Sequence, residues 1–382
     1  MRNPNRGALA LAVLALLMGA CGGAGSGTTA GSETTGGVET TAGGGASSDE
    51  TIQVAFVYLG PVGEHGWNFR HDQARVALET EFGDRVETSF LENVAGGPSS
   101  ERVFDDLARN GVDFVVASAF DYHDQVVAVA ANHPETLFTG PGFYELSANV
   151  TDYEGGFEEG AFLGGMAAAS LVEGDELGIL AAFPIPEVLR SVNGYLAGAR
   201  TINPDATLQV VWTSTWEDPL VEGQAAEALF DTGVKAIIQT TDLTSTGEIA
   251  EERGGYWSEI YDNGLPYAPN AYTIGGVYDL DSYVIQTVQQ LIDGTFESGV
   301  YYNNMANGGI KPGPMGPAID DETKSKLQET IDKMTAGEFS VFTGPLFDQE
   351  GNEVLPAGEV ADTDFLITMD FLLDGVQGSL PS

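Results

Sequence analysis

Tyr58–Arg75, with the sequence YLGPVGEHGWNFRHDQAR, is the stretch that decides the fold. It follows an alternating apolar run at residues 52–57 and precedes apolar positions with helical spacing at Ala74, Leu78 and Phe82. The stretch therefore joins a predicted strand to a predicted helix. In α/β folds this position binds ligands, because the carboxyl ends of parallel strands open into a crevice and the next helix points free N–H groups into it.

The loop inside this stretch contains three glycines, Gly60, Gly63 and Gly66, that let the backbone turn tightly. Their spacing is G-x-x-G-x-x-G, which differs from the spacings of dinucleotide-binding and phosphate-binding loops. Glu64 also places a negative charge where a phosphate would lie. The loop therefore favours a neutral or cationic flat ligand, with Trp67 as a ring at the rim. Alternatively, Trp67 packs the first helix against the core without touching a ligand.

The amino-terminal region predicts export and anchoring. Residues 1–20 have a basic start, an apolar stretch and a small-residue end, which is typical of a secretory signal. Cys21, the only cysteine, follows directly and cannot form an internal disulfide. Its position resembles a bacterial lipobox, which implies a lipid anchor at the extracytoplasmic face of the cell membrane. A free buried thiol is disfavoured, since residues 21–50 are rich in Gly, Ser and Thr and predict a disordered tether.

The charge balance excludes several partners. The chain has 57 acidic and 15 basic residues and a formal net charge of -42. Nucleic acid and anionic lipid would repel such a chain, so a nucleic-acid partner is not expected. The acids are spread over predicted helix faces and loops, which indicates a solvated surface that stays soluble in strong salt.

The remaining part, roughly 330 residues, is too long for one compact core and suits two lobes. Predicted strands alternate with predicted helices in two blocks, which favours parallel sheets covered on both faces. We therefore predict an α/β fold with two Rossmann-like lobes around a central cleft. The predicted strands after the first lie at residues 86–91, 112–117, 135–138, 176–180, 207–211 and 233–240.

Aromatic and small polar residues follow several of these strands, at the ends that face a cleft. Phe120, Phe183 and Trp216 offer rings, and Asp242 offers a carboxylate. Such a set suits a flat, nitrogen-rich ring, because each aromatic face contributes about 1–3 kcal/mol by stacking. Asp242 would accept a hydrogen bond from a ring N–H or an exocyclic amine.

Three segments carry a family resemblance: GPVGEHGWNFRHDQAR at 60–75, AAFPIPEVLR at 181–190 and WTSTWEDP at 212–219. Together they resemble the basic membrane protein (BMP) family, the solute-binding lipoproteins of ABC importers for purine nucleosides and related purines. The resemblance implies a type I periplasmic binding protein fold, an ABC permease and ATPase as partners, and a monomer. The domain organisation expected is lobe 1 at 51–150, lobe 2 at 151–270, a return to lobe 1 at 271–310 and a carboxyl-terminal segment at 311–382 packing mainly on lobe 2.

The resemblance also implies which residues bind the ligand. Asn68 stands beside Trp67 where relatives more often carry threonine, which leaves the polarity of the rim open. Asp262 lies where relatives hold a ribose or a base edge, although the surrounding sequence departs from their pattern. Packing remains an alternative role for Phe120 and Phe183. The expected ligand-binding residues are Trp67, Asn68, Phe120, Phe183, Trp216, Asp242 and Asp262.

Catalysis is the competing class of function. The sequence has no H-E-x-x-H, C-x-x-C or G-x-S-x-G motif and no aspartate-dense loop at a strand end, so no catalytic residue, metal site or cofactor is expected. A nucleoside hydrolase is therefore disfavoured. The predicted function is a lipoprotein that binds a purine base or nucleoside between its lobes and delivers it to an ABC permease. A tethered purine sensor or surface-interaction protein without transport is the alternative.

Overall fold

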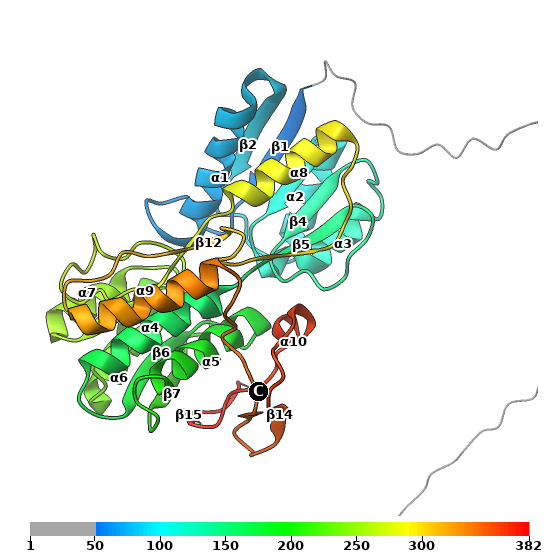
Figure 1. Ribbon diagram of the computed structural model, residues 1–382. Coiled ribbons are helices and arrows are strands. Elements are labelled where there is room, and N and C mark those ends of the chain that lie inside the picture. Colours follow the sequence, from blue (N-terminus) through cyan, green and yellow to red (C-terminus); the bar gives the residue numbers. More distant parts are fainter. Residues whose placement is uncertain (1–50, 382) are drawn as a thin grey trace, which may run out of the picture. The chain divides into compact units, whose positions relative to one another are not determined.

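The computed structural model describes residues 51–381, which belong to one compact unit. The predicted signal at 1–20, the lipidation site Cys21 and the tether at 21–50 lie outside the described residues. Two parallel sheets organise the described part, one in each lobe (Figure 1). This confirms the predicted α/β architecture with parallel sheets.

The first sheet has six strands in the order β11-β5-β4-β3-β1-β2, and every neighbouring pair is parallel. Four helices accompany it, and we call the sheet and these helices the first lobe. The strands are β1 (Ile52–Val57), β2 (Val86–Leu91), β3 (Phe114–Ala117), β4 (Leu137–Gly140), β5 (Val150–Gly155) and β11 (Val300–Asn303). The helices are α1 (Gly66–Phe82), α2 (Pro98–Arg109), α3 (His123–Ala130) and α8 (Asp281–Asp293).

The second sheet has five strands in the order β15-β7-β6-β8-β9 and is also parallel throughout. With its helices it forms the second lobe. The strands are β6 (Glu176–Ala181), β7 (Thr207–Trp212), β8 (Ala236–Gln239), β9 (Tyr256–Ser258) and β15 (Val376–Gln377). The helices are α4 (Phe157–Leu171), α5 (Pro186–Arg200), α6 (Pro219–Thr232) and α7 (Ser245–Arg253).

The last eighty or so residues complete the second lobe with short elements. Helix α9 packs on α4, α10 packs on α5, and β15 extends the second sheet beside β7. Two small antiparallel pairs, β10 with β12 and β13 with β14, lie outside the main sheets. Their bounds are β10 (Gly276–Tyr278), β12 (Ile310–Pro312), α9 (Asp321–Thr335), β13 (Leu346–Phe347), β14 (Glu353–Leu355) and α10 (Thr363–Ile367).

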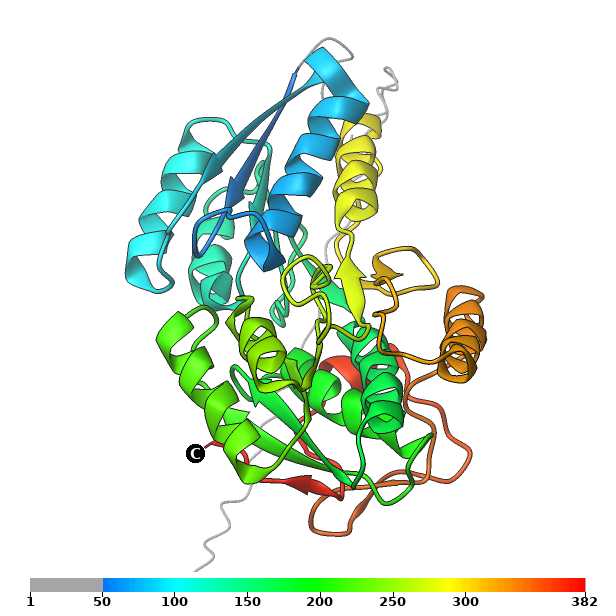
Figure 2. The ribbon, with the colours of Figure 1, turned by 90° about the vertical axis from the view of Figure 1, so that its left-hand side faces the viewer.

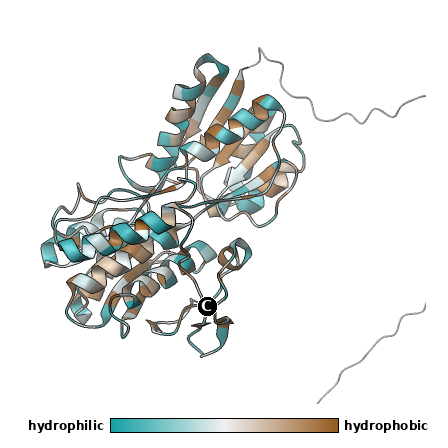
Figure 3. Ribbon diagram, in the orientation of Figure 1, coloured by the Kyte–Doolittle hydropathy of each residue, from teal (hydrophilic) through white to brown (hydrophobic). Residues whose placement is uncertain are grey.

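Strand side chains alternate between two cores, because successive residues of a strand point to opposite faces. In β1, Val54 and Phe56 pack with α1 and α8, whereas Val57 packs with residues of α2 and α3. In the second lobe, Leu180 packs with α6 and α7 on one face, while Ile179 faces α4 and α5. Figure 2 shows these helices on both faces of each sheet, and Figure 3 shows the strands as the most apolar elements.

The chain crosses between the lobes three times. It leaves the first lobe between β5 and α4, returns through the segment from β9 to β10, and crosses again between β11 and β12. One apolar core, which contains Tyr153, Phe157 and Tyr278, runs from the first lobe through the crossings into the second. The crossings are therefore packed, and the two lobes are joined by a continuous core.

Candidate functional site

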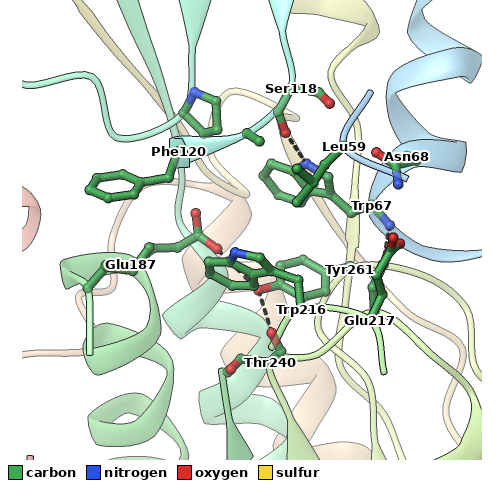
Figure 4. A pocket seen from close by; sticks show the side chains of 14 residues that line it. Leu59, Trp67, Asn68, Ser118, Phe120, Glu187, Trp216, Glu217, Thr240 and Tyr261 are labelled. Atoms are coloured by element: carbon green, nitrogen blue, oxygen red, sulfur yellow. Dashed lines mark hydrogen bonds between the residues drawn. The ribbon is translucent and has the colours of Figure 1, made fainter. Parts of the chain in front are cut away.

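A pocket opens where the strands of both sheets end (Figure 4). Its lining residues come directly after the carboxyl ends of strands in each lobe, as the loop after β1 predicted. The first lobe contributes Leu59, Trp67, Asn68, Ser118, Ala119, Phe120 and Pro141. The second lobe contributes Ile185, Glu187, Trp216, Glu217, Thr240, Asp242 and Tyr261.

Trp67 is the most firmly held ring of this pocket. Its indole N–H donates to the carbonyl of Ser118 at 2.6 Å, at the end of β3. One face of the indole stacks on Tyr278, with ring centres 5.4 Å apart and planes 17° apart, and Tyr261 meets it edge-on. Trp67 therefore combines two roles that the sequence left open: it packs α1 against the core and it lines the pocket.

Trp216 is held more loosely, on the opposite lobe. Its indole N–H donates to Asp121 at 3.2 Å, across to the first lobe. Its ring packs on Phe183, with centres 5.1 Å apart. The structure places Phe183 behind Trp216, outside the pocket lining, while Phe120 lines the pocket directly. Phe183 thus supports a pocket ring in this structure.

Three carboxyl groups line the pocket, those of Glu187, Glu217 and Asp242. Among the pocket residues in the described part of the chain there is no Lys, Arg or His. Burial is the largest cause that raises the pKa of each of these carboxyl groups, to about 7 for Glu187. The site therefore offers hydrogen-bond acceptors and carboxyl groups whose burial favours the uncharged form, and it disfavours phosphates and other anions.

Asp242 and Asp262 both bind the amino-terminal end of α1 from the second lobe. Asp242 accepts the backbone N–H of Trp67. Asp262 accepts the backbone N–H of Gly66 at 3.2 Å and pairs with the guanidinium of Arg70. Free N–H groups at a helix start carry partial positive charge, which suits these carboxylates. We call this set of contacts the inter-lobe clasp.

The contacts of the inter-lobe clasp determine which oxygens of the two aspartates remain open to the pocket. Asp242 still lines the pocket, but one of its oxygens is engaged by Trp67. Asp262 does not line the pocket and is buried against the first lobe. Gly66 has φ +83°, and a side chain there would collide with Asp242, so the close approach of the lobes requires glycine.

Several pocket residues were not among the ligand-binding residues expected from the sequence, and two of them, Glu187 and Tyr261, are joined by a hydrogen bond. Glu187 belongs to the segment 181–190, one of the three that carried the family resemblance, and it begins α5 just after β6. Tyr261 follows β9 and donates its O–H to Glu187 at 3.1 Å. Both residues follow the end of a strand, and residues at that position face the cleft. Glu187 could therefore have been predicted, although Pro184 and Pro186 precede it.

The free space in the pocket is narrow. The enclosed cavity has a volume of about 50 Å³, room for a few water molecules. Counting the open mouth, the empty space is about 530 Å³. The enclosed part of the pocket is small in this structure, and the three crossings between the lobes are the places where a hinge motion would widen it.

The part of the chain that the structure describes is residues 51–381. Nowhere in this range do three or more His, Cys, Asp or Glu side chains gather so that they could hold a metal ion. No helix in the same range combines the length and the apolar character needed to cross a membrane.

Two parallel sheets, three crossings and a pocket at the strand ends define the fold of the type I periplasmic binding proteins. Solved structures agree: an ABC solute-binding protein from Aeropyrum pernix matches with a TM-score of 0.65 at 21% identity, over 82% of this chain and 95% of that one. One from Conexibacter woesei matches with a TM-score of 0.60 at 22% identity, over 76% of this chain and 98% of that one.

The sequence comparison then gives the family. Residues 51–340 match the model of the Bmp family, described as ABC transporter substrate-binding protein PnrA-like, and the chain belongs to this family. It is 36% identical over 343 residues to a purine-binding protein of Brucella abortus, covering 89% of this chain and 97% of that one. It is 34% identical over 342 residues to a putative ABC transporter glucose-binding protein of Haloferax volcanii, and the match covers 89% of this chain and 84% of that one.

Family membership confirms the predicted class: a substrate-binding protein of an ABC transporter rather than an enzyme family. Proteins of this class work on the extracytoplasmic side of the membrane.

Proposed function

We propose that this protein binds a purine base or nucleoside in the pocket between its lobes and delivers it to an ABC permease. The observation that carries the proposal is the pocket itself, which combines the rings of Trp67, Phe120 and Trp216 with three carboxyl groups and, within residues 51–381, no cation. Two stacking faces at about 1–3 kcal/mol each supply much of the roughly 8 kcal/mol of a micromolar affinity. The purine-binding relative supports the same ligand class.

The proposed setting is the outer face of the cell membrane. Lipidation of Cys21, after removal of the signal at 1–20, would anchor the chain, and residues 21–50 would tether the lobes near a permease and its ATPase. The monomer that the family resemblance implied is part of this proposal. The three crossings would serve as the hinge for ligand entry and release.

A hexose is the second candidate ligand. One observation favours it: the Haloferax volcanii relative is described as a putative glucose-binding protein. Aromatic rings and carboxyl groups also suit a sugar, because ring C–H groups pack on the aromatic faces and hydroxyl groups donate to the acids. The polar groups of the pocket are compatible with both ligands, so a binding measurement is needed to distinguish them.

The test is a thermal-shift titration of the purified protein at moderate and high salt. The ligands are adenine, guanine, hypoxanthine, adenosine, guanosine and inosine, with glucose, ribose and leucine for comparison. A ligand at a hundredfold excess over its dissociation constant stabilises the folded state by about 2.7 kcal/mol. Shifts with purines alone support the proposal, and a shift with glucose alone replaces it with the sugar-binding function. No shift with any of them would exclude both.

A further inference from the structure

Glu187 occupies a special place among the pocket carboxyl groups, at the first turn of α5. The O–H of Tyr261 donates to its Oε1 at 3.1 Å and fixes the orientation of the carboxyl group. As far as residues 51–381 are concerned, no protein hydrogen bond reaches its other oxygen, Oε2. Figure 4 shows the group at the pocket wall, so Oε2 is available to a ligand.

The surroundings of Glu187 give it no counter-ion of its own. Arg190, one turn further along α5, is buried and binds Glu154 of β5 at 2.6 Å, and it lies 3.4 Å from Glu158 of α4. Tyr302 adds a hydrogen bond to Glu158 at 2.6 Å. The guanidinium of Arg190 therefore already lies against two other carboxyl groups, those of Glu154 and Glu158, and it is not a dedicated partner of Glu187.

The remaining neighbours do not supply a positive charge either. The titratable groups that face Glu187 from other elements are Tyr153, Tyr261 and Tyr278, whose pKa values burial raises, so their hydroxyls stay neutral. Burial, followed by repulsion from Glu154, raises the pKa of Glu187 to about 7, against the lowering influence of Arg190 and Tyr261. A ligand that covers the pocket removes more water and favours the uncharged form further.

We propose that Glu187 is a specificity-determining residue that binds the ligand as a neutral carboxylic acid, donating the O–H of Oε2 and accepting at Oε1 beside the hydrogen bond from Tyr261, so that it fits an edge that carries an acceptor beside a donor. This inference rests on the proposed purine-binding function and names the recognition within it. Both 6-aminopurines and 6-oxopurines have such edges. An edge with two adjacent donors, or an anionic ligand, matches the neutral acid poorly.

The test exploits glutamine, which has the same shape and the same donor and acceptor as the neutral acid but does not titrate. Affinities for adenine and hypoxanthine are measured by calorimetry at pH 6, 7 and 8 and constant ionic strength. With a pKa of about 7, wild-type affinity falls about tenfold from pH 6 to pH 8, because the neutral fraction falls by that factor. The variant Glu187→Gln should bind at pH 6, 7 and 8 with the affinity that the wild-type protein has at pH 6. The variant Glu187→Ala should bind at least tenfold more weakly than the wild-type protein at pH 6.

Glu101→Gln, at an exposed position of α2, is the matched control and should follow the wild-type profile. Melting curves confirm that each variant is folded. A loss of affinity in Glu187→Gln at every pH would overturn the inference, since the ionised form would then be the binding form. A wild-type pH profile retained in Glu187→Gln would overturn it too. Absence of any purine binding by the wild-type protein would instead count against the proposed function.

Discussion

The two walls of the pocket differ in kind. The first lobe presents Leu59, Trp67, Phe120 and Pro141 with little polarity beyond Asn68 and Ser118, whereas the second lobe presents all three carboxyl groups, those of Glu187, Glu217 and Asp242. A flat ligand can therefore stack on the first wall and be discriminated by the second, because buried polar groups cost most when they are left unpaired. The comparison teaches that the pocket's carboxyl groups all lie on the second lobe, whereas each lobe offers an indole for stacking, Trp67 on the first and Trp216 on the second.

The largest expected effect comes from removing one indole from each wall. Trp67→Ala should lower the free energy of unfolding by about 3 kcal/mol and also weaken purine binding more than a hundredfold, because Trp67 both packs on Tyr278 and lines the pocket. Trp216→Ala should weaken binding by about 1–3 kcal/mol while costing less than about 1 kcal/mol of stability, because Trp216 is only half-buried and its indole is held by Phe183 and an exposed hydrogen bond to Asp121. Denaturant unfolding and calorimetry measure the two quantities.

Phe183→Ala is the control for this pair. It removes a ring of the same wall that does not line the pocket, so its effect on binding should be smaller than that of Trp216→Ala. Equal stability losses in Trp67→Ala and Trp216→Ala would contradict the difference in anchoring between the walls.

The next effect is the pH dependence of stability, which tests the neutral state of the buried acids. Burial raises the pKa of Glu187 and Glu222 to about 7, and that of Glu159 and Asp152 to about 8. Between the ordinary carboxyl pKa near 4.5 and these values, the folded protein binds more protons than the unfolded chain. Stability should therefore fall as pH rises from about 5 to 8, by a few kcal/mol, and the melting temperature should fall by several degrees.

Glu159→Gln tests this prediction at one residue. Glutamine has the size of glutamate and still offers an acceptor to the backbone N–H of Met305, which Glu159 accepts at 2.7 Å, but it does not titrate. The variant should show a flatter melting-temperature profile between pH 5 and 8 than the wild-type protein. A wild-type melting temperature that rises over this range would mean that the buried acids are ionised in the folded state.

Much of the fold was readable from the sequence, for a physical reason. Strands such as β3 and β6 are buried on both faces over most of their length, so their apolar runs are almost continuous and bounded by turns. The strands β5, β9, β11 and β15 and the antiparallel pairs were not predicted; among them, the strands of two or three residues carry no periodic pattern. β4 also begins at Leu137, two residues later than expected, since Thr136 closes a turn with His133.

The site was predictable at its strand ends and unpredictable across the lobes. Trp67, Asn68, Phe120, Trp216 and Asp242 follow strands or begin a helix, and the structure brings all of them to the pocket. The contacts of Asp262 could not be predicted from the sequence. Its partners Gly66 and Arg70 are almost two hundred residues away in the chain, so only the folded arrangement places them together.

The smallest expected effect separates a ligand contact from a clasp contact at Asp262. Asp262→Asn should keep an acceptor for the N–H of Gly66 but weaken the pairing with Arg70, which is partly exposed, so the affinity loss should stay below about tenfold. Because Asp262 joins the lobes without lining the pocket, the loss should be the same for adenine and adenosine. Asp205→Asn, in an exposed loop of the second lobe, serves as the control. Calorimetry with both ligands gives the ratio of affinities, and a loss confined to adenosine would show that Asp262 binds the ribose after all.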